Sequence, residues 1–350
     1  MTAARDEVLA AARSGDERAF AELVERHRRE LRVHCYRMLG SFDDAEDVLQ
    51  ETLLRAWKGI AGFEGRASVR GWLYTIATNA CLDVLRVRSR RVLPQHLGAP
   101  SGLDVDLPPR TDIPWLQPFP DRLWEPPAPP DTEPDAVVVG RETIELAFLA
   151  AIQHLPPRQR AVLLLRDVLG WPARDTATAL GSSVASVTSA LQRARETLRE
   201  RLPPESVQQR RLDWTAQEPT ESERAVLRRY MDALNRADVA GVAALLAEDV
   251  RAAMPPLPMW YQGRATVEAA LRLSWDPTGP AYIGRFHAVP VDANGHPAAA
   301  AYLRPPGGTA FEACAIGVPV IADGMIVELT SFHDPGLFAA FGLPMTFRPA

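Results

Sequence analysis

Residues 63–91 constrain the fold of this chain more than any other stretch. Apolar residues recur there at the three- and four-residue spacing of a helix with one buried face: Leu73, Ile76, Ala77, Ala80, Val84 and Val87. The opposite face is polar and carries Thr75, Asn79, Asp83, Arg86 and Arg90. Just upstream, residues 65–68 form a short basic loop that ends in Ser68, a residue suited to cap a helix N-terminus.

A helix with hydroxyl and amide groups at one end and arginines at the other can hold a phosphate backbone while it offers hydrogen bonds to bases. The stretch therefore supplies a set of candidate nucleic-acid contacts: Arg66, Ser68, Thr75, Asn79, Arg86, Arg90 and Arg91. By composition alone, an ordinary amphipathic helix with a solvated basic end is the simpler interpretation.

The motif GWLYTIATNACLDVLR, preceded by DDAEDVLQETLLRAWKG at 43–59, favours the first interpretation. This two-part pattern resembles the second conserved region of the extracytoplasmic-function (ECF) sigma factors, small members of the sigma-70 family. The resemblance implies that the second part captures the melted minus-ten element of promoter DNA. It also implies that the first part, a helix capped by Asp43, binds core RNA polymerase through outward-facing residues: Asp44, Asp47, Gln50 and Glu51. A solvated acidic surface is the alternative for those four.

Charge and composition divide the rest of the chain. The net charge of −5 combines +2 over residues 1–100, −6 over 101–140, +4 over 141–211 and −5 over 212–350. Any nucleic-acid contact is therefore expected in the two basic blocks. Residues 93–135 hold 12 of the 31 prolines, which predicts an extended or irregular linker. Its apolar residues are expected to pack on another part of the protein: Trp115, Leu116, Phe119 and Trp124.

The second basic block has the pattern of a helix-turn-helix. A helix is expected over 158–169, then a short helix over 173–180, a turn at Gly181, and a longer helix from Val184. LPPRQRAVLLLRDVLGW and the unit after it resemble the fourth conserved region of the same family, which reads the minus-thirty-five element. Four residues are predicted to face the major groove: Thr188, Ser189, Gln192 and Arg193. Many relatives have an arginine near position 188, so the resemblance does not give the DNA sequence that this chain prefers. A helical hairpin without a DNA role is the alternative.

The last third changes character. Helices are expected over 227–234, from a cap at Asp238 to 246, and over 265–273, followed by strands over 282–291, 298–303, 311–321 and 325–332 with a hairpin turn at Asp323-Gly324. The order resembles the SnoaL-like polyketide-cyclase fold, a cone with a curved antiparallel sheet. Predicted pocket residues are Asp249, Trp260, Tyr261, His287, Glu328 and His333. Since neighbours in a strand face opposite sides, His333 and Asp334 are not expected to act as a catalytic pair, and a packing or small-ligand role is favoured.

The predicted fold class is therefore two all-α domains, the second with a helix-turn-helix, followed by an α+β cone. The predicted boundaries are 1–98, a linker at 99–137, then 138–204, a connector at 205–217, and 218–350. The predicted function is a cytoplasmic sigma factor, not an enzyme and regulated in cis by its C-terminal domain. Its predicted partners are core RNA polymerase, promoter DNA and a candidate small-molecule ligand, with no metal, cofactor or membrane. A ligand-responsive DNA-binding regulator that works without polymerase, or a cyclase-like enzyme fused to DNA-binding domains, are the alternatives.

Overall fold

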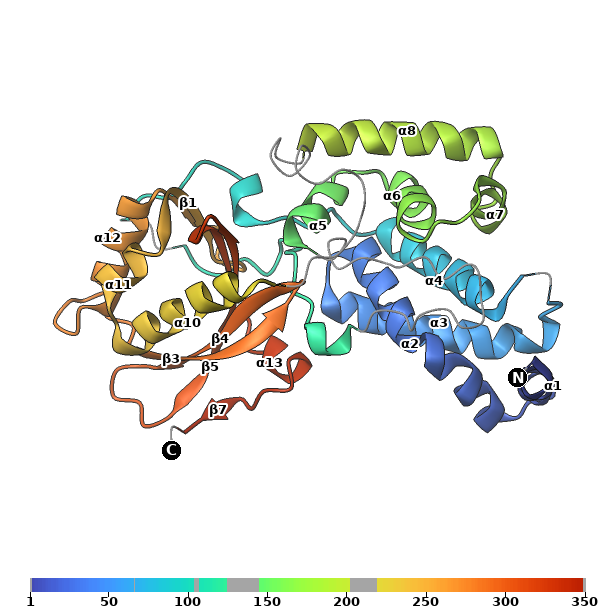
Figure 1. Ribbon diagram of the computed structural model, residues 1–350, viewed down its shortest axis with the longest axis horizontal. Helices are drawn as coiled ribbons and strands as arrows, with labels where there is room; N and C mark the ends of the chain where they lie inside the picture. Colours follow the sequence, from blue (N-terminus) through green and yellow to red (C-terminus); the bar gives the residue numbers. More distant parts are fainter. Residues whose placement is uncertain (1, 66, 104–106, 125–144, 202–218, 349–350) are drawn as a thin grey trace. The chain divides into compact units, whose positions relative to one another are not determined.

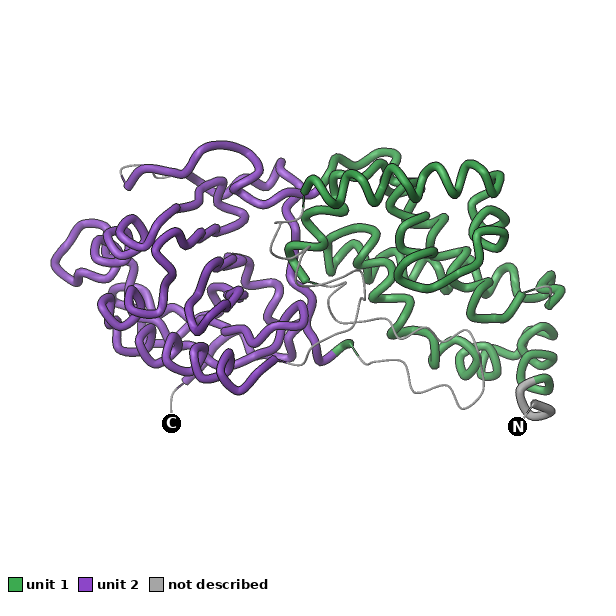
Figure 2. The backbone as a smooth tube through the Cα atoms, turned by 45° about the horizontal axis from the view of Figure 1, so that its top comes forward, with its two compact units in different colours: residues 1–90, 123–216 green, residues 91–122, 217–350 purple. Residues whose placement is uncertain are grey.

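The computed structural model describes residues 2–65, 67–103, 107–124, 145–201 and 219–348 (Figure 1). The chain divides into two compact units, which Figure 2 colours separately. The first unit comprises residues 1–90 and 123–216, and the second comprises residues 91–122 and 217–350. The segment between the two helical blocks thus belongs to the same unit as the C-terminal third of the chain.

The first unit opens with four helices: α1 (Thr2–Arg13), α2 (Glu17–Leu39), α3 (Phe42–Gly59) and α4 (Val69–Leu85), with the short 3-10 turn η1 (Ile60–Gly62) after α3. The predicted break after α2 is present, because Gly40 takes the left-handed conformation at φ 69° and ends the helix. Ser41 caps α3 by accepting a hydrogen bond from the Asp44 amide, so the expectation of Asp43 at this position is corrected. Ser68 caps α4 as expected, with its hydroxyl 3.1 Å from the Gly71 amide.

The second part of this unit contains α5 (Leu146–Ile152), α6 (Pro157–Leu163), the π-helical turn η5 (Leu164–Val168), α7 (Ala173–Ala179) and α8 (Val184–Arg201). The region expected to be a single helix over 158–169 therefore consists of the α-helix α6, which continues directly as the π-helical turn η5. Gly181, at φ 57°, makes the turn between α7 and α8. The predicted inner stripe of α8 is buried: Val187, Leu191, Ala194 and Leu198. The short helix, glycine turn and long helix form the predicted helix-turn-helix.

A buried arginine joins the two parts of the first unit. Helix α6 packs against α2 and α4, and Arg160 on α6 is only 2% exposed. Its guanidinium donates hydrogen bonds to the carbonyls of Ile152 and Leu155 and to the side chain and carbonyl of Gln153. It also donates to the Met38 carbonyl at the end of α2. Burial lowers the pKa of Arg160 to about 10, but the side chain stays charged at neutral pH and satisfies these buried acceptors.

The second unit is an α+β domain built on one sheet. The strands are β1 (Leu246–Ala253), β2 (Trp260–Gln262), β3 (Arg285–Ala293), β4 (His296–Arg304), β5 (Phe311–Ala322), β6 (Met325–Phe332) and β7 (Thr346–Phe347). Their order is β2-β1-β6-β5-β4-β3, with β7 paired to β5. The helices α10 (Glu221–Arg236), α11 (Val239–Ala243) and α12 (Arg264–Trp275) cover one face, and α13 (Leu337–Ala340) follows β6 (Figure 1).

The sheet differs from expectation at one edge. The predicted antiparallel pairings of β3 to β6 are present, and Asp323 and Gly324 form the tight turn with φ values of 50° and 74°. However, β1 pairs with β6 in parallel, so the sheet is mixed rather than antiparallel. Neither β1 nor β2 was predicted. The helix capped by Asp238 ends at Ala243 instead of reaching residue 246, and β1 begins there.

The linker Arg91–Arg122 is ordered along the second unit where the structure describes it. It includes the 3-10 turns η2 (Pro94–His96) and, at its end, η3 (Asp121–Leu123). Two of its apolar side chains are almost fully buried, Leu116 at 1% exposure and Phe119 at 0%. The Phe119 amide donates to the Asn294 side chain at 2.9 Å, and the Asn294 amide returns a bond to the Phe119 carbonyl at 3.0 Å. The apolar segment around Leu116 and Phe119 thus packs within the second unit, whereas Trp124, at 9% exposure, falls in the first unit.

Candidate functional site

The polar face of α4 is held by contacts inside the first unit. The Thr75 hydroxyl donates to the Gly71 carbonyl at 2.9 Å. The side-chain amide of Asn79 donates to the Thr75 carbonyl at 2.9 Å and to the Ala179 carbonyl, at the end of α7, at 3.3 Å. Thr75 and Asn79 are therefore half-buried rather than exposed. The side-chain amide of Asn79 thus has two backbone partners, one of them in the helix-turn-helix.

Aromatic packing adds to this contact between α4 and the helix-turn-helix part. Tyr74 on α4 meets the ring of Trp171, just before α7, edge to face at 6.2 Å between centroids. Tyr74 also contacts Glu30 of α2, since its hydroxyl lies 3.2 Å from the Glu30 carboxylate. The same carboxylate accepts a hydrogen bond from Arg70 at 2.8 Å. Burial by itself would raise the pKa of Glu30, but hydrogen bonds from His27 and Arg70 lower it overall. The carboxylate therefore stays ionised and fixes α4 on α2.

The basic end of the predicted stripe lies beyond the helix. Helix α4 ends at Leu85, so Val87 is 86% exposed instead of buried. Arg86 pairs with Asp83 at 2.7 Å, and Arg90 lies 2.8 Å from a ring nitrogen of His154. Arg91 falls in the second unit, where it donates to the Trp115 carbonyl at 2.6 Å. Ser68, which caps the N-terminus of α4, is exposed. Arg66 lies outside the described residues.

Of the four residues of α3 that were predicted to face outward, three do so in the structure. Asp47, Gln50 and Glu51 are exposed. Asp44 is buried at 9% exposure and pairs with Arg88, so its expected outward orientation is corrected. The reason is helical spacing, since Asp44 lies one turn before the buried Val48 and therefore on the inner side of α3.

The four residues predicted to face the major groove are all exposed on α8: Thr188, Ser189, Gln192 and Arg193. Gln192 shares a hydrogen bond of 3.1 Å with Glu196, one turn further on. The helix is fixed on its support by Arg195, which makes a two-pronged ion pair with Asp167 of η5 at 2.7 and 2.8 Å. One polar face of α8 is thus exposed, while the opposite stripe of the helix is buried.

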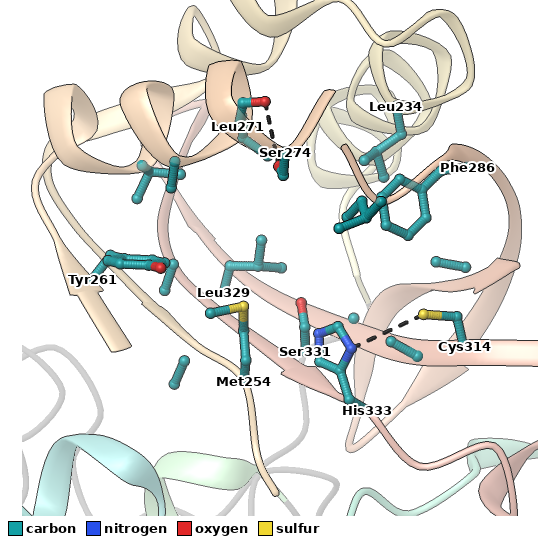
Figure 3. A pocket seen from close by; sticks show the side chains of 18 of the residues that line it. Leu234, Met254, Tyr261, Leu271, Ser274, Phe286, Cys314, Leu329, Ser331 and His333 are labelled. Atoms are coloured by element: carbon teal, nitrogen blue, oxygen red, sulfur yellow. Dashed lines mark hydrogen bonds between the residues drawn. The ribbon is translucent and has the colours of Figure 1, made fainter. Parts of the chain in front are cut away.

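A cavity of about 460 Å³ lies between the sheet and the helices of the second unit (Figure 3). Its walls come from α10, β1, residues 254–261, α12 and the facing side of β3 to β6. Of the six predicted pocket residues, Tyr261 and His333 line it. His333 follows β6 directly, and Figure 3 shows its ring directed into the cavity beside Ser331.

The other four predicted pocket residues lie outside this lining, which corrects their placement. Asp249 is exposed on β1. His287 stacks on Phe347 with 4.3 Å between ring centroids. Glu328 pairs with Arg251 at 2.8 Å, and burial raises its pKa although Arg251 acts in the opposite direction. Trp260 turns to the linker, where its indole N–H donates to the Gly98 carbonyl at 3.0 Å.

The titratable side chains in the cavity are uncharged at neutral pH. Burial lowers the pKa of His333 to about 4 and raises the pKa of the Cys314 thiol to about 11. The Cys314 sulfur lies 4.0 Å from Nδ1 of His333. No aspartate, glutamate, lysine or arginine is among the lining residues that the structure describes. The arrangement can hold a molecule, but it offers no carboxylate to work with the histidine.

Two functional features had weaker sequence signals. Arg160 sits among the apolar residues of LPPRQRAVLLLRDVLGW, and an arginine within a buried face is the signal that would have found it. Trp260, predicted as a pocket residue, instead holds the linker.

Across the described ranges, no helix has the length and apolar character that a membrane crossing requires. The same ranges contain no cluster of three or more histidine, cysteine or acidic side chains placed to hold a metal ion.

Comparison with known proteins agrees with this geometry. Models of "Sigma-70 region 2", "Sigma-70, region 4" and "SnoaL-like domain" match residues 23–91, 145–198 and 227–329. The ECF RNA polymerase sigma factor SigG of Mycobacterium tuberculosis is 41% identical over 333 residues, which cover 95% of this chain and 85% of SigG. SigM of the same species is 32% identical over 192 residues, or 55% of this chain and 81% of SigM.

A solved structure shows the same fold along almost the whole chain. The extracytoplasmic function sigma factor SigJ of Mycobacterium tuberculosis aligns with a TM-score of 0.57 at 22% identity, over 93% of this chain and 98% of SigJ. Two helical domains, one with a helix-turn-helix, and a SnoaL-like α+β domain define a transcription initiation factor of the sigma-70 type. The chain belongs to the extracytoplasmic-function RNA polymerase sigma factors.

Proposed function

We propose that this sigma factor binds core RNA polymerase through the exposed acidic face of α3 and directs it to promoters with two separate elements. Helix α4 captures flipped bases of the melted minus-ten element, and α8 reads the minus-thirty-five duplex in the major groove. The observation that carries the proposal is the face of α8, where the four candidate reading residues are exposed and the opposite stripe is buried. Relatives that carry the same two sigma domains support it.

We propose further that the first unit opens before it initiates transcription. The amide of Asn79 donates to Ala179, and Trp171 packs on Tyr74. A melted base at Asn79 would compete with both contacts, so the helix-turn-helix part has to leave α4. Separation costs these contacts, and binding to polymerase and promoter must supply that free energy.

The linker suggests how the C-terminal domain regulates this step. Residues Arg91–Arg122 connect the two promoter-binding domains but pack within the second unit. The burial of Leu116 and Phe119 and the paired hydrogen bonds of Phe119 with Asn294 support a stable attachment. While they are attached, residues 91–122 are not free to extend as the two promoter-binding domains separate. We propose that the C-terminal domain controls initiation in cis through this attachment.

The two alternatives have less support. A polymerase-independent regulator leaves the acidic face of α3 without a use. A cyclase-like enzyme would need an acid–base pair in the cavity, and His333 has no carboxylate beside it among the described lining residues. We therefore propose a binding role for the C-terminal domain and no catalysis.

Polymerase binding tests the first step directly. The double substitution Asp47→Arg and Glu51→Arg should weaken capture of core polymerase by about tenfold, because it reverses two charges on the proposed contact surface. Glu22→Arg, on the exposed side of α2, is the matched control and should bind like the wild type. Equal capture by all three proteins would contradict the assigned surface. Capture of none of the three proteins, with all three folded, would favour the polymerase-independent regulator.

A further inference from the structure

We propose that the cavity of the second unit binds one uncharged, mostly apolar small molecule that carries a hydroxyl or carbonyl group. We further infer that residues 254–261, one wall of the cavity, transmit its presence to the linker.

The size and lining of the cavity select an apolar, uncharged molecule. Its volume of about 460 Å³ lies within the range of roughly 300–1,000 Å³ that is usual for small-molecule sites. Most of the wall is aliphatic or aromatic, with Leu234, Leu271, Phe286 and Leu329 around the centre (Figure 3). A charged group placed there would lose its hydration without a counter-charge among the described lining residues, which is costly.

One side of the cavity supplies a polar anchor. Ser331 and His333 extend into it from the end of β6, with Cys314 of β5 beside them (Figure 3). Buried His333 is neutral, so its ring offers one hydrogen-bond donor and one acceptor, while the Ser331 hydroxyl offers both. A hydroxyl or carbonyl group meets this pair without burying a charge. The anchor therefore favours alcohols, ketones or esters over hydrocarbons and over carboxylates.

Residues 254–261 contact the cavity on one side and the linker on the other. Met254, Leu257, Met259 and Tyr261 line the cavity. The same segment holds the linker, because the Ser101 amide donates to the Trp260 carbonyl at 2.8 Å and the Arg110 amide donates to the Pro256 carbonyl at 2.9 Å.

The wall is also tied to the anchor, since the His333 amide donates to the Pro255 carbonyl at 2.7 Å. A molecule that packs on the inner side restricts the wall and so stabilises the linker on its outer side.

The test uses the full-length chain and the naphthalene dye Prodan, which is uncharged, carries one ketone and changes its emission with polarity. We expect saturable binding with a blue-shifted emission. The anionic naphthalene dye ANS should bind about tenfold more weakly or worse, because its sulfonate would be buried without a partner. Absence of saturable Prodan binding, or equally tight binding of ANS, would overturn the assignment.

Three variants locate the dye. Ala301→Phe places a phenyl ring in the cavity and should abolish binding, while thermal melting verifies that the protein is folded. His333→Phe keeps an aromatic ring at this position but removes the ring nitrogens that would hydrogen-bond the ketone of the dye, and should weaken binding about fivefold. His287→Phe, outside the cavity, is the matched control and should bind normally. Normal binding to Ala301→Phe, or an equal loss in His287→Phe, would contradict a site in this cavity.

Hydrogen exchange tests the transmission. With Prodan bound, the amides of Ser101 and Arg110 should exchange several-fold more slowly, and Ala301→Phe should show no response to the dye. Unchanged exchange at saturating Prodan would overturn the coupling. Only the use of this coupling in transcription rests on the proposed function. Because the assays contain no polymerase, failure here is distinguishable from failure of the sigma-factor proposal.

Discussion

At the scale of single residues, Asn79 links the structure to the proposed mechanism. Its position on α4 is the one that the family resemblance assigns to base reading, and its amide donates to two backbone carbonyls. Periodicity placed Asn79 on the polar face of the helix. The partner at Ala179 lies 100 residues further along the chain, so no local pattern could have predicted that this face is covered.

We expect Asn79→Ala to weaken formation of the open promoter complex by about 1–3 kcal/mol, the usual cost of one lost base contact. Binding to polymerase should be unchanged, because the proposed contact surface is on α3. Permanganate footprinting measures the melting, and Arg193→Ala serves as a control that should leave melting at the minus-ten element intact once the complex has formed. Normal melting by Asn79→Ala would remove Asn79 from the base-reading set.

His34 predicts how stability depends on pH. Its ring lies 2.9 Å from the Thr78 hydroxyl in the core of the first unit. Burial, followed by the charge of Arg37, lowers its pKa to about 3 against the opposing effect of Glu30, with Arg70 also lowering it. The unfolded chain therefore takes up a proton near pH 6.5 that the folded chain does not. Stability should fall as the pH falls from 6.5 towards 3, by about 1.4 kcal/mol per unit for this group.

Urea unfolding at pH 7, 6 and 5 measures this slope. His34→Gln keeps a hydrogen-bonding partner for Thr78 but does not titrate, so its stability should depend less steeply on pH. The same slope in both proteins would show that His34 is not the group responsible.

At the scale of elements, the helices and the strands β3 to β6 could be predicted because their patterns are local. Caps and turns at Ser68, Asp238 and Asp323-Gly324 followed from residue chemistry. Strand β1 was missed because LAEDVRAA shows no clean alternation: its buried residues, Leu246, Val250, Ala252 and Ala253, are unevenly spaced. Its parallel pairing with β6 joins distant segments. The cavity was predicted, but four of the six candidate residues lie outside its lining, because strand register decides which face of the sheet each side chain takes.

Helix α8 carries the prediction for duplex reading. Arg193 and Arg199 are both exposed, but Arg193 belongs to the predicted reading face and Arg199 lies near the C-terminal end of the helix. We expect Arg193→Ala to change the preferred minus-thirty-five sequence, and Arg199→Ala to lower affinity for all sequences alike. Selection from a randomised minus-thirty-five library measures both. Identical preferred sequences for the wild type and Arg193→Ala would exclude Arg193 from base reading.

At the scale of the whole molecule, the chain alternates between its two units. The linker was expected to be a proline-rich spacer with an apolar patch that packs on another part of the protein. Residues 91–122, which include Trp115, Leu116 and Phe119, are found in the unit that contains the C-terminal domain, whereas Trp124 falls in the first unit. Composition indicated the patch, but the partner surface at Asn294 is formed only when the sheet folds. The junctions at 125–144 and 202–218 lie outside the described residues.

Truncation after Pro204 tests regulation in cis. If the domain restrains the two promoter-binding domains through the linker, the truncated protein should give several-fold more transcript than the full chain at equal abundance. The full-length variant Phe119→Ala, which removes a completely buried linker side chain, should move output in the same direction. Unchanged output from both would leave the C-terminal domain as a passive solubility domain, and a decrease would assign it a supporting role instead.

The most direct test of the account is transcription in vitro with purified core polymerase, with start sites mapped by sequencing. A promoter-directing sigma factor should give discrete starts that share a minus-ten and a minus-thirty-five element. Transcript from these starts should fall by about tenfold with the Asp47→Arg and Glu51→Arg double substitution and be retained with Glu22→Arg. No start above the background of core polymerase alone would contradict the assignment of this chain as a promoter-directing sigma factor.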